Sequence, residues 1–351
     1  MRLIVTGGGT GGHVFPAIEV AQSARARGAD VAYFGSLRGQ EGQASQVAGI
    51  EFRGFPAQPL WSLKTLRGWK SAIGLLRASA AARQAMATHR PDVMFSTGGY
   101  SAAPIMYAAR KLGVPLVIHE QNSIPGRSNR IFAKVAASVG VTFHRSLRVF
   151  GASATRVGLP VRKELVAMAA GVRERTHVVV VGGSQGAQAV NAVAARAAEG
   201  DAPHPWIHAT GPSNFDAEAA AKARPGYRVE PYLDVAQMGG ALASAAVVLG
   251  RAGASTMTEI AWFGLPSILV PLPSAMDDHQ TENAREFEAL GIATLLPQAE
   301  ATPERVLELV RNWREADPAA IQAKCAEWIV PDSVDRILAM LDAACSKAPL
   351  S

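Results

Sequence analysis

Seven consecutive residues near the start of the chain join a glycine-rich backbone to one titratable side chain: Gly7-Gly8-Gly9-Thr10-Gly11-Gly12-His13. The apolar residues 3–5 before them predict a buried strand, and Pro16 after them predicts the first turn of a helix. Such a turn presents backbone N–H groups and the positive end of the helix dipole to an anion, usually a phosphate. The spacing matches neither the G-x-G-x-x-G fingerprint with its acidic residue nor the P-loop. We interpret the run as an anion site beside a histidine; a tight turn with a surface histidine is the alternative.

A second glycine turn follows about half a chain later, at Gly182-Gly183-Ser184-Gln185-Gly186-Ala187. It comes after the apolar residues 177–181 and before a helix expected over 187–199, so it repeats the order strand, glycine loop, helix. We expect it to begin a second α/β domain. A cleft between two such domains is a usual place for a ligand, and each helix N-terminus can hold one anionic group. The two loops therefore predict two phosphate-bearing substrates.

Strand and helix patterns alternate along the chain. Further strands are expected at 31–34, 93–96, 116–119, 206–209, 247–250 and 267–270, with alanine-rich helices such as 71–88 and 101–112 between strands. This order is typical of α/β proteins with parallel sheets, in which ligands bind beyond the carboxyl ends of the strands. Glu120 and Asn122 follow one strand directly and are well placed for a ligand. His119, beside the apolar run, is expected to be a structural histidine.

Residues 253–259 form another strand-to-helix turn, with small side chains, hydroxyls and one carboxylate. In the functional interpretation, backbone and hydroxyl groups contact a pyrophosphate, and Glu259 accepts hydrogen bonds from two ribose hydroxyls. In the alternative, Thr256 and Glu259 form a capping box that needs no ligand.

Residues 277–283 supply acids, an imidazole and amides. These groups could hydrogen-bond to sugar hydroxyls or coordinate a metal. The alternative is a solvated helix start with an aspartate as its N-cap. The spacing disfavours a metal, and no D-x-D triplet occurs in the sequence. Positive charge for a pyrophosphate would then come from helix N-termini and from Arg162 or Arg251.

Composition limits the class of protein. The 351 residues predict about two domains, and 48% hydrophobic residues exclude a disordered chain. A net charge of +6 favours an anionic partner. Only Cys325 and Cys345 occur, which fits a reducing cytoplasm. Residues 1–2 lead straight into the first strand, so we expect no signal peptide, and no apolar run is long enough to span a membrane.

The segment from Leu60 to Arg77 differs from its surroundings. It contains two tryptophans, several leucines and four cations, and it has no acidic residue. Basic amphipathic segments of this kind bind anionic membrane surfaces. An ordinary loop leading into a helix that packs on the sheet is the alternative.

Taken together and in order, these segments resemble the bacterial MurG family. The resemblance runs from the first strand to the helix after residue 284 and rests on residues 8–13, 98–100, 119–122, 160–162, 182–187, 253–259 and 277–284. It implies a GT-B glycosyltransferase, with two Rossmann-like domains whose parallel sheets face each other across a cleft. We expect an acceptor- and membrane-facing domain over residues 1–162 and a donor domain over 163–332, with a helix at about 333–351 packing back on the first.

The family activity implied by this resemblance is transfer of N-acetylglucosamine from UDP-N-acetylglucosamine to the 4-hydroxyl of MurNAc in undecaprenyl-pyrophosphoryl-MurNAc-pentapeptide, called lipid I. The product is lipid II, made at the cytoplasmic face of the inner membrane by a peripheral enzyme. No cofactor, metal or nucleic acid is implied. Leu159 replaces the asparagine common before the Pro-Val-Arg motif, and Ala252 and Ser255 also depart from the family, which affects the contact set rather than the reaction.

Carried over by motif position, the implied donor contacts are Thr10, Gly11, Gly12, Asn122, Arg162, Ser184, Leu233, Ala254, Ser255, Thr256, Met257, Thr258, Glu259 and Gln280. Glu259 would hold the ribose, the backbone of Ala254 the uracil, and Gln280 the hexosamine hydroxyls. The α-linked donor and β-linked product require one in-line displacement with a base on the acceptor hydroxyl. His13 is the candidate base, since a histidine titrates near neutral pH. Glu120 either orients His13 or is itself the base.

Three alternatives stay open. An NAD(P) dehydrogenase would need an acidic residue about 20 residues after the first glycine turn, where the second strand ends in Phe34-Gly35-Ser36 instead. A UDP-N-acetylglucosamine 2-epimerase would use the same fold and donor without a lipid acceptor. A non-catalytic nucleotide- or anion-binding protein would need only the glycine turns.

Overall fold

The computed structural model describes residues 1–57, 65–171, 174–201 and 204–346. Contacts divide the chain into two units, Met1–Pro160 with Val330–Ser351 and Val161–Ile329. After residue 329 the chain therefore returns to unit 1. The sequence places the corresponding boundaries after residues 162 and 332.

Unit 1 contains a seven-stranded parallel sheet in the order β3-β2-β1-β4-β5-β6-β7. Its strands are β1 (Arg2–Thr6), β2 (Asp30–Ser36), β3 (Glu51–Phe55), β4 (Val93–Ser96), β5 (Leu116–Glu120), β6 (Ser138–Val141) and β7 (Ala154–Arg156). Strand β1 lies between β2 and β4, where Ile4 pairs with Ala32 on one side and Met94 on the other. The strand order reverses between β1 and β4, which is the place where open α/β sheets bind ligands.

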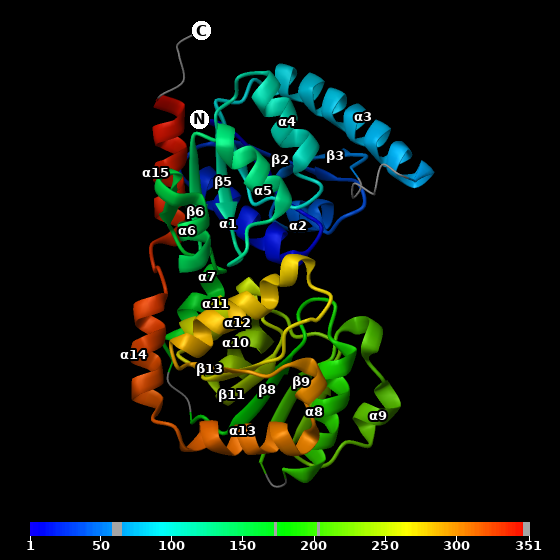
Figure 1. Cartoon of the computed structure of the whole chain (residues 1–351), viewed down its shortest axis with the longest axis vertical. Helices are drawn as coiled ribbons and strands as arrows, with labels where there is room; N and C mark the ends of the chain where they lie inside the picture. Colours follow the sequence, from blue (N-terminus) through cyan, green and yellow to red (C-terminus); the bar gives the residue numbers. More distant parts are fainter. Residues whose placement is uncertain (58–64, 172–173, 202–203, 347–351) are drawn as a thin grey trace. The chain divides into compact units, whose positions relative to one another are not determined.

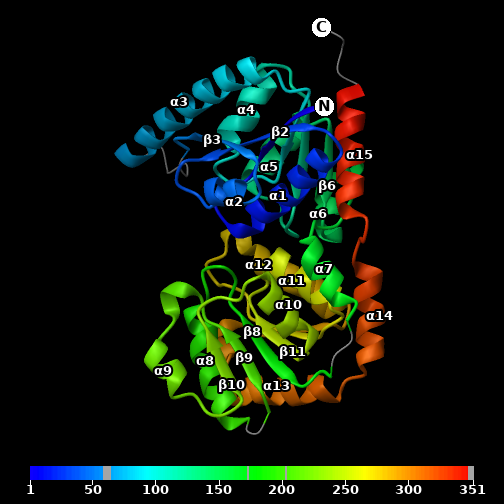
Figure 2. The same ribbon diagram turned by 180° about the vertical axis from the view of Figure 1, so that it is seen from behind.

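Helices cover both faces of this sheet (Figures 1 and 2). Its helices are α1 (Gly11–Ala26), α2 (Glu41–Val47), α3 (Leu66–His89), α4 (Ala103–Lys111), α5 (Arg127–Phe132), α6 (His144–Phe150) and α15 (Ser333–Ser346). Because side chains alternate along a strand, Leu3 and Val5 pack in one core with α1 and α15, while Ile4 packs in the other with α3 and α4. The C-terminal helix α15 thus belongs to the core of unit 1, with Ile337 and Leu341 fully buried.

Unit 2 contains a six-stranded parallel sheet in the order β10-β9-β8-β11-β12-β13. Its strands are β8 (His177–Val181), β9 (Trp206–Ala209), β10 (Tyr227–Glu230), β11 (Ala245–Gly250), β12 (Ser267–Leu269) and β13 (Ala293–Leu295). The order reverses between β8 and β11, so this sheet has the same kind of switch point as the first.

The faces of the second sheet are covered in the same way (Figure 2). Its helices are α7 (Lys163–Ala169), α8 (Gln188–Gly200), α9 (Ala217–Ala221), α10 (Val235–Ala243), α11 (Ala254–Trp262), α12 (His279–Ala289), α13 (Pro303–Glu315) and α14 (Pro318–Trp328). Val178 and Val180 of β8 pack with α8 and α13, and Val179 and Val181 pack with α7, α10 and α11. The continuous valine run of β8 reflects burial on both faces of a parallel sheet.

The basic segment from Leu60 to Arg77 is only partly covered by the structure. Residues 60–64 lie outside the described residues, as do the side chains of 66–70, and the backbone of α3 begins at Leu66. In the described part of this segment, Ile73 and Leu76 are exposed and Ser71 is buried.

Candidate active site

The first glycine turn lies at the switch point of unit 1 and is interlocked with the loop after β4. The backbone N–H of Gly8 donates to the carbonyl oxygen of Gly98 at 3.2 Å. A methyl group on Gly99, whose φ is +89°, would lie 2.1 Å from the carbonyl oxygen of Gly8. Only glycine combines this left-handed conformation with so close an approach. The two loops therefore hold each other in a single arrangement at the carboxyl edge of the sheet.

His13 is oriented by the same interlocked loops. Its Nδ1 lies 2.9 Å from the carbonyl oxygen of Thr97, and the hydroxyl of Thr97 donates to the carbonyl oxygen of His13 at 2.8 Å. A carbonyl oxygen only accepts, so Nδ1 carries the hydrogen and the neutral imidazole has its lone pair on Nε2. His13 is half-buried in the first turn of α1. The imidazole therefore has the tautomer that a general base acting through Nε2 requires.

Three predicted contacts of the first turn lie beside His13 at the start of α1. Thr10 occupies the N-cap position and is exposed, and Gly11 and Gly12 are the first residues of the helix. The first N–H groups of a helix have no partner within the helix, and they carry the positive end of its dipole. This geometry suits an anionic group.

Glu120 is an anchor for the loop that follows β5. Its carboxylate accepts hydrogen bonds from the N–H of Asn122 at 2.9 Å, the N–H of Gly126 at 3.0 Å and Nδ2 of Asn129 at 2.8 Å. Burial raises the pKa of Glu120, which is 1% exposed, and these hydrogen bonds oppose that rise. Both oxygens are thus engaged in holding the loop on which Asn122 lies. This arrangement suits a positioning role better than proton abstraction.

His119 has a structural role, as expected. It is fully buried, its Nε2 donates to the carbonyl oxygen of Gly158 at 2.7 Å, and its Nδ1 accepts from Nε2 of Gln121 at 3.1 Å. Burial lowers the pKa of His119 to about 4, so the ring stays neutral near pH 7. It ties β5 to Gly158, which follows β7.

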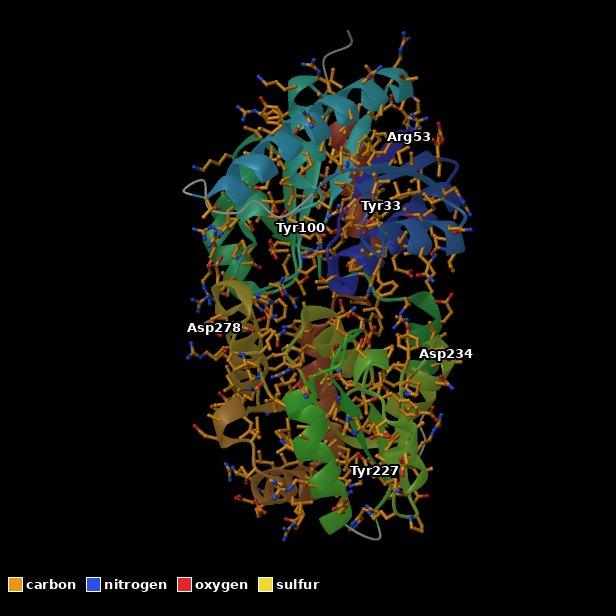
Figure 3. The ribbon with its side chains drawn as sticks, turned by 90° about the vertical axis from the view of Figure 1, so that its right-hand side faces the viewer. Tyr33, Arg53, Tyr100, Tyr227, Asp234 and Asp278 are labelled. Carbon is orange, nitrogen blue, oxygen red and sulfur yellow. The ribbon has the colours of Figure 1, made fainter. Side chains whose placement is uncertain are left out.

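Glu41 was not singled out in the sequence, although it contacts the first glycine turn. It is fully buried, and its Oε1 accepts from the hydroxyl of Ser101 at 3.2 Å. A methyl group on Gly8 would lie 1.6 Å from that oxygen. Burial and the charge of Glu41 raise the pKa values of Tyr33 and Tyr100, both labelled in Figure 3. The sequence signal that could have identified Glu41 was its position, because it follows β2, the strand next to β1.

The second glycine turn lies at the switch point of unit 2, directly before α8. Ser184 is exposed on it, and a methyl group on Gly186, with φ of +72°, would lie 1.9 Å from the carbonyl oxygen of Thr210. The turn therefore rests directly on the loop after β9. Leu233, another predicted contact, is 2% exposed and belongs to the core beside α10.

Residues 253–259 lie on the other side of the same switch point, after β11. Gly253 is the N-cap of α11, so Thr256 lies inside the helix and the capping-box alternative is wrong. Thr258 donates its hydroxyl to the carbonyl oxygen of Ala254 at 2.8 Å. The predicted contacts Ala254, Ser255, Thr256 and Met257 thus form the first turn of α11, where backbone N–H groups suit an anion or a polar ring edge.

Arg162 and Glu259 form an ion pair in unit 2. The guanidinium Nη2 lies 3.1 Å from Oε1 of Glu259, and the two side chains are 20% and 16% exposed. Burial raises the pKa of Glu259, and the charge of Arg162 opposes that rise. The carboxylate is thus held in place before any ligand arrives. The sequence singled out both residues, and the structure adds that they contact each other.

Gln280 and Arg251 are positioned by the loop after β12. The side-chain oxygen of Gln280 accepts from the N–H of Leu272 at 3.0 Å, which orients its amide. The Arg251 guanidinium donates to the carbonyl oxygens of Val270 and Pro271 at 3.0 and 2.9 Å and to Oε1 of Gln298 at 2.7 Å. Arg251 therefore supports the loop, and Arg162 is the better candidate for pyrophosphate charge.

Both halves of the chain match known protein families. Residues 3–141 match the glycosyltransferase family 28 N-terminal domain, and residues 177–337 match the C-terminal domain of that family. Two parallel sheets, each with a glycine loop at its switch point, together with these matches define a glycosyltransferase of the GT-B class.

Curated relatives match over nearly the whole chain. A protein from Exiguobacterium sp. is 35% identical over 97% of this chain and 99% of its own, and one from Shewanella amazonensis is 40% identical over 86% of each. Both are named UDP-N-acetylglucosamine–N-acetylmuramyl-(pentapeptide) pyrophosphoryl-undecaprenol N-acetylglucosamine transferase. The crystal structure of Acinetobacter baumannii MurG is similar with a TM-score of 0.77 and 28% identity, covering 97% of this chain and 99% of that one. The chain therefore belongs to the MurG family.

Proposed function

We propose that this protein transfers N-acetylglucosamine from UDP-N-acetylglucosamine to the 4-hydroxyl of MurNAc in lipid I, giving lipid II for peptidoglycan synthesis. The observation that carries the proposal is the match, over 97% of the chain, to a curated transferase of that name. Two features, each within its own unit, support it: the orientation of His13 beside the first glycine turn, and the Arg162–Glu259 pair beside the second.

In this reaction the donor carbon is attacked once and inverted. Nε2 of His13 takes the proton of the acceptor 4-hydroxyl as the new O–C1 bond forms and the C1–O bond to UDP breaks. The negative charge that develops on UDP is stabilised by Arg162, by the second glycine turn and by the N-terminus of α8. Glu259 holds the ribose, and Gln280 contacts the hexosamine hydroxyls. The N-terminus of α1 receives the pyrophosphate of the acceptor.

One assay tests this function directly. The protein is incubated with labelled UDP-N-acetylglucosamine, with and without a lipid I analogue, and both UDP and sugar products are measured. We expect UDP release only when the acceptor is present, because a hydroxyl nucleophile is needed. Conversion of the donor without acceptor would support the 2-epimerase instead, and no conversion in either sample would contradict both activities.

We further propose that the enzyme works as a peripheral protein on the anionic cytoplasmic surface of the inner membrane. The composition of one helix layer of unit 1 supports this proposal. The layer consists of α3, α4, α5 and α6 and is called the α3–α6 layer below. These four helices contain no acidic residue, whereas α1, α2 and α15 of the other layer all do. The α3–α6 layer also exposes Leu76, Ile131 and Val149, with 67%, 64% and 55% of their surface accessible. Exposed apolar side chains on basic helices without acidic residues are typical of an interfacial surface.

The described helices are all too short or too polar to cross a bilayer. Binding to the surface would therefore rest on insertion of these apolar side chains and on attraction between cations and lipid headgroups. The segment from Leu60 to Arg77 leads into the same layer through α3. The proposed membrane-binding surface is therefore the α3–α6 layer, and the sequence-predicted basic segment continues into it through α3.

Reversing charge on this surface should release the protein from anionic vesicles. In the triple variant Arg110→Glu, Arg130→Glu and Arg148→Glu, one cation is reversed on each of α4, α5 and α6. Each basic residue near an anionic surface contributes about 1 kcal/mol, and the introduced carboxylates add repulsion, so we expect binding to weaken by at least about a hundredfold. Sedimentation with phosphatidylglycerol vesicles measures the change, and a second variant at Lys64, Arg67 and Lys70 extends the test.

The matched control changes the net charge by the same amount on unit 2, through Arg228→Glu, Arg305→Glu and Arg311→Glu. Equal losses in the two triple variants would mean that net charge alone drives binding. Binding of the first variant at wild-type strength would contradict the proposed surface.

A further inference from the structure

Three side chains of unit 2 form a chain of hydrogen bonds that leads to the second glycine turn. His208, on β9, is 1% exposed; its Nδ1 lies 2.8 Å from the hydroxyl of Tyr227, on β10, and its Nε2 lies 3.0 Å from Oδ1 of Asn191, on α8. Nδ2 of Asn191 donates to the carbonyl oxygen of Thr210 at 2.8 Å. Tyr227 is labelled in Figure 3.

The direction of every hydrogen bond in this chain is determined. The Thr210 carbonyl can only accept, so the amide of Asn191 donates to it and presents its oxygen to His208. That oxygen accepts from Nε2–H of His208, so in the neutral ring Nδ1 accepts from the Tyr227 hydroxyl. Burial lowers the pKa of His208 to about 4 and raises that of Tyr227 to about 12, so both groups stay neutral near pH 7. The donor and acceptor roles are thus fixed from Tyr227 to Thr210.

The hydrogen-bond chain ends at the Thr210 carbonyl oxygen, on which the second glycine turn packs. The Thr210 carbonyl is the atom that a methyl group on Gly186 would approach to 1.9 Å, so Gly186 packs directly on it. Asn214 Nδ2 donates to the same carbonyl at 3.4 Å and to the carbonyl oxygen of Gln185 at 3.2 Å. A displacement of Thr210 would therefore move Gln185 and Gly186 with it.

We propose that Tyr227 and His208 are positioning residues for diphosphate binding. Through Asn191 they hold the Thr210 carbonyl under Gly186, and so they keep the backbone of residues 183–187 and the N-terminus of α8 in the geometry that a nucleoside diphosphate needs. Neither side chain contacts the ligand. The inference rests on the proposed function, in which this turn receives the diphosphate of the donor.

The test compares UDP with uridine, which lacks the diphosphate, by calorimetric titration. Tyr227→Phe removes only the hydroxyl that begins the hydrogen-bond chain. We expect it to weaken UDP binding by about three- to tenfold, the effect of one hydrogen bond, and to leave uridine binding unchanged. A merely structural role would weaken both ligands by the same factor.

Thr294→Val is the matched control. Thr294 lies on β13, at the opposite edge of the same sheet from β10. The substitution removes the hydroxyl that accepts a hydrogen bond from Nε1 of Trp313 at 3.1 Å. We expect Thr294→Val to lower the melting temperature about as much as Tyr227→Phe does. It should leave the dissociation constants of both UDP and uridine unchanged. UDP binding of Tyr227→Phe at wild-type strength, or an equal loss for UDP and uridine, would overturn the inference alone. Failure of the wild type to bind UDP would overturn the proposed function and the inference with it.

Discussion

Replacement of His13 by asparagine is expected to lower kcat by about 10²- to 10⁴-fold, the usual contribution of a positioned general base. The asparagine amide can still donate to the Thr97 carbonyl, which accepts from Nδ1 of His13 at 2.9 Å in the wild type. It lacks the basic nitrogen at the position of Nε2. The loss should therefore fall on proton transfer, and the dissociation constant for UDP should stay unchanged, since the proposed UDP contacts of the second turn and α11 belong to unit 2.

The measurement is acceptor-dependent turnover at saturating substrates, together with calorimetric titration of UDP. His204→Asn is the control and should retain full turnover, because it changes an exposed histidine of unit 2 whose Nδ1 also lies against a main-chain carbonyl oxygen, that of Asp201 at 3.3 Å. If His13→Asn kept a near-normal kcat, His13 would not be the base. The role would then pass to Glu120, despite its burial and its three hydrogen bonds to the following loop.

Replacement of Glu259 by alanine should weaken UDP binding by at least about a hundredfold. In the proposed complex the carboxylate accepts two hydrogen bonds from the ribose, and a hydrogen bond to a charged group contributes about 1.5–3 kcal/mol. The change also leaves Arg162, whose side chain is 20% exposed, without the carboxylate that it contacts at 3.1 Å. Glu259→Gln, which keeps the volume and one acceptor oxygen, should cost about tenfold.

A comparison of ligands isolates the ribose contact from the ion pair. UDP and 2′,3′-dideoxy-UDP are titrated against the wild type and Glu259→Ala. The wild type should prefer UDP strongly, and the variant should bind the two ligands almost equally, because the partner of the hydroxyls has been removed. A preference for UDP that survives in the variant would show that Glu259 does not hold the ribose.

The arrangement of central strands and glycine turns could be predicted because it is encoded locally. Buried parallel strands carry continuous apolar runs, as in residues 177–181, and glycine turns follow them directly, so the order of elements can be recognised along the sequence. Edge and outer strands were not predicted. In β3 and β10 charged residues such as Glu51, Arg53, Arg228 and Glu230 alternate with others, because one side of an edge strand faces solvent.

The candidate residues could be proposed from the sequence, but their hydrogen-bond partners could not. Glu120 was expected to contact a ligand or act as a base, and the structure engages both of its oxygens with the loop after β5. Arg251 was a candidate for pyrophosphate charge, and its guanidinium donates to main-chain carbonyls instead. A side chain's type can be known from the sequence, whereas its hydrogen-bond partners depend on which distant segments meet it.

The sequence by itself determined two α/β halves, a glycine turn after the first strand of each half, and membership of a glycosyltransferase family. These features follow from apolar periodicity and turn chemistry within short windows of the chain. Only the tertiary structure decided the tautomer of His13, the pairing of Arg162 with Glu259 and the hydrogen-bond chain from Tyr227 to Thr210. The first two contacts join residues 84 and 97 positions apart, and strand order and crossovers alone bring such residues together.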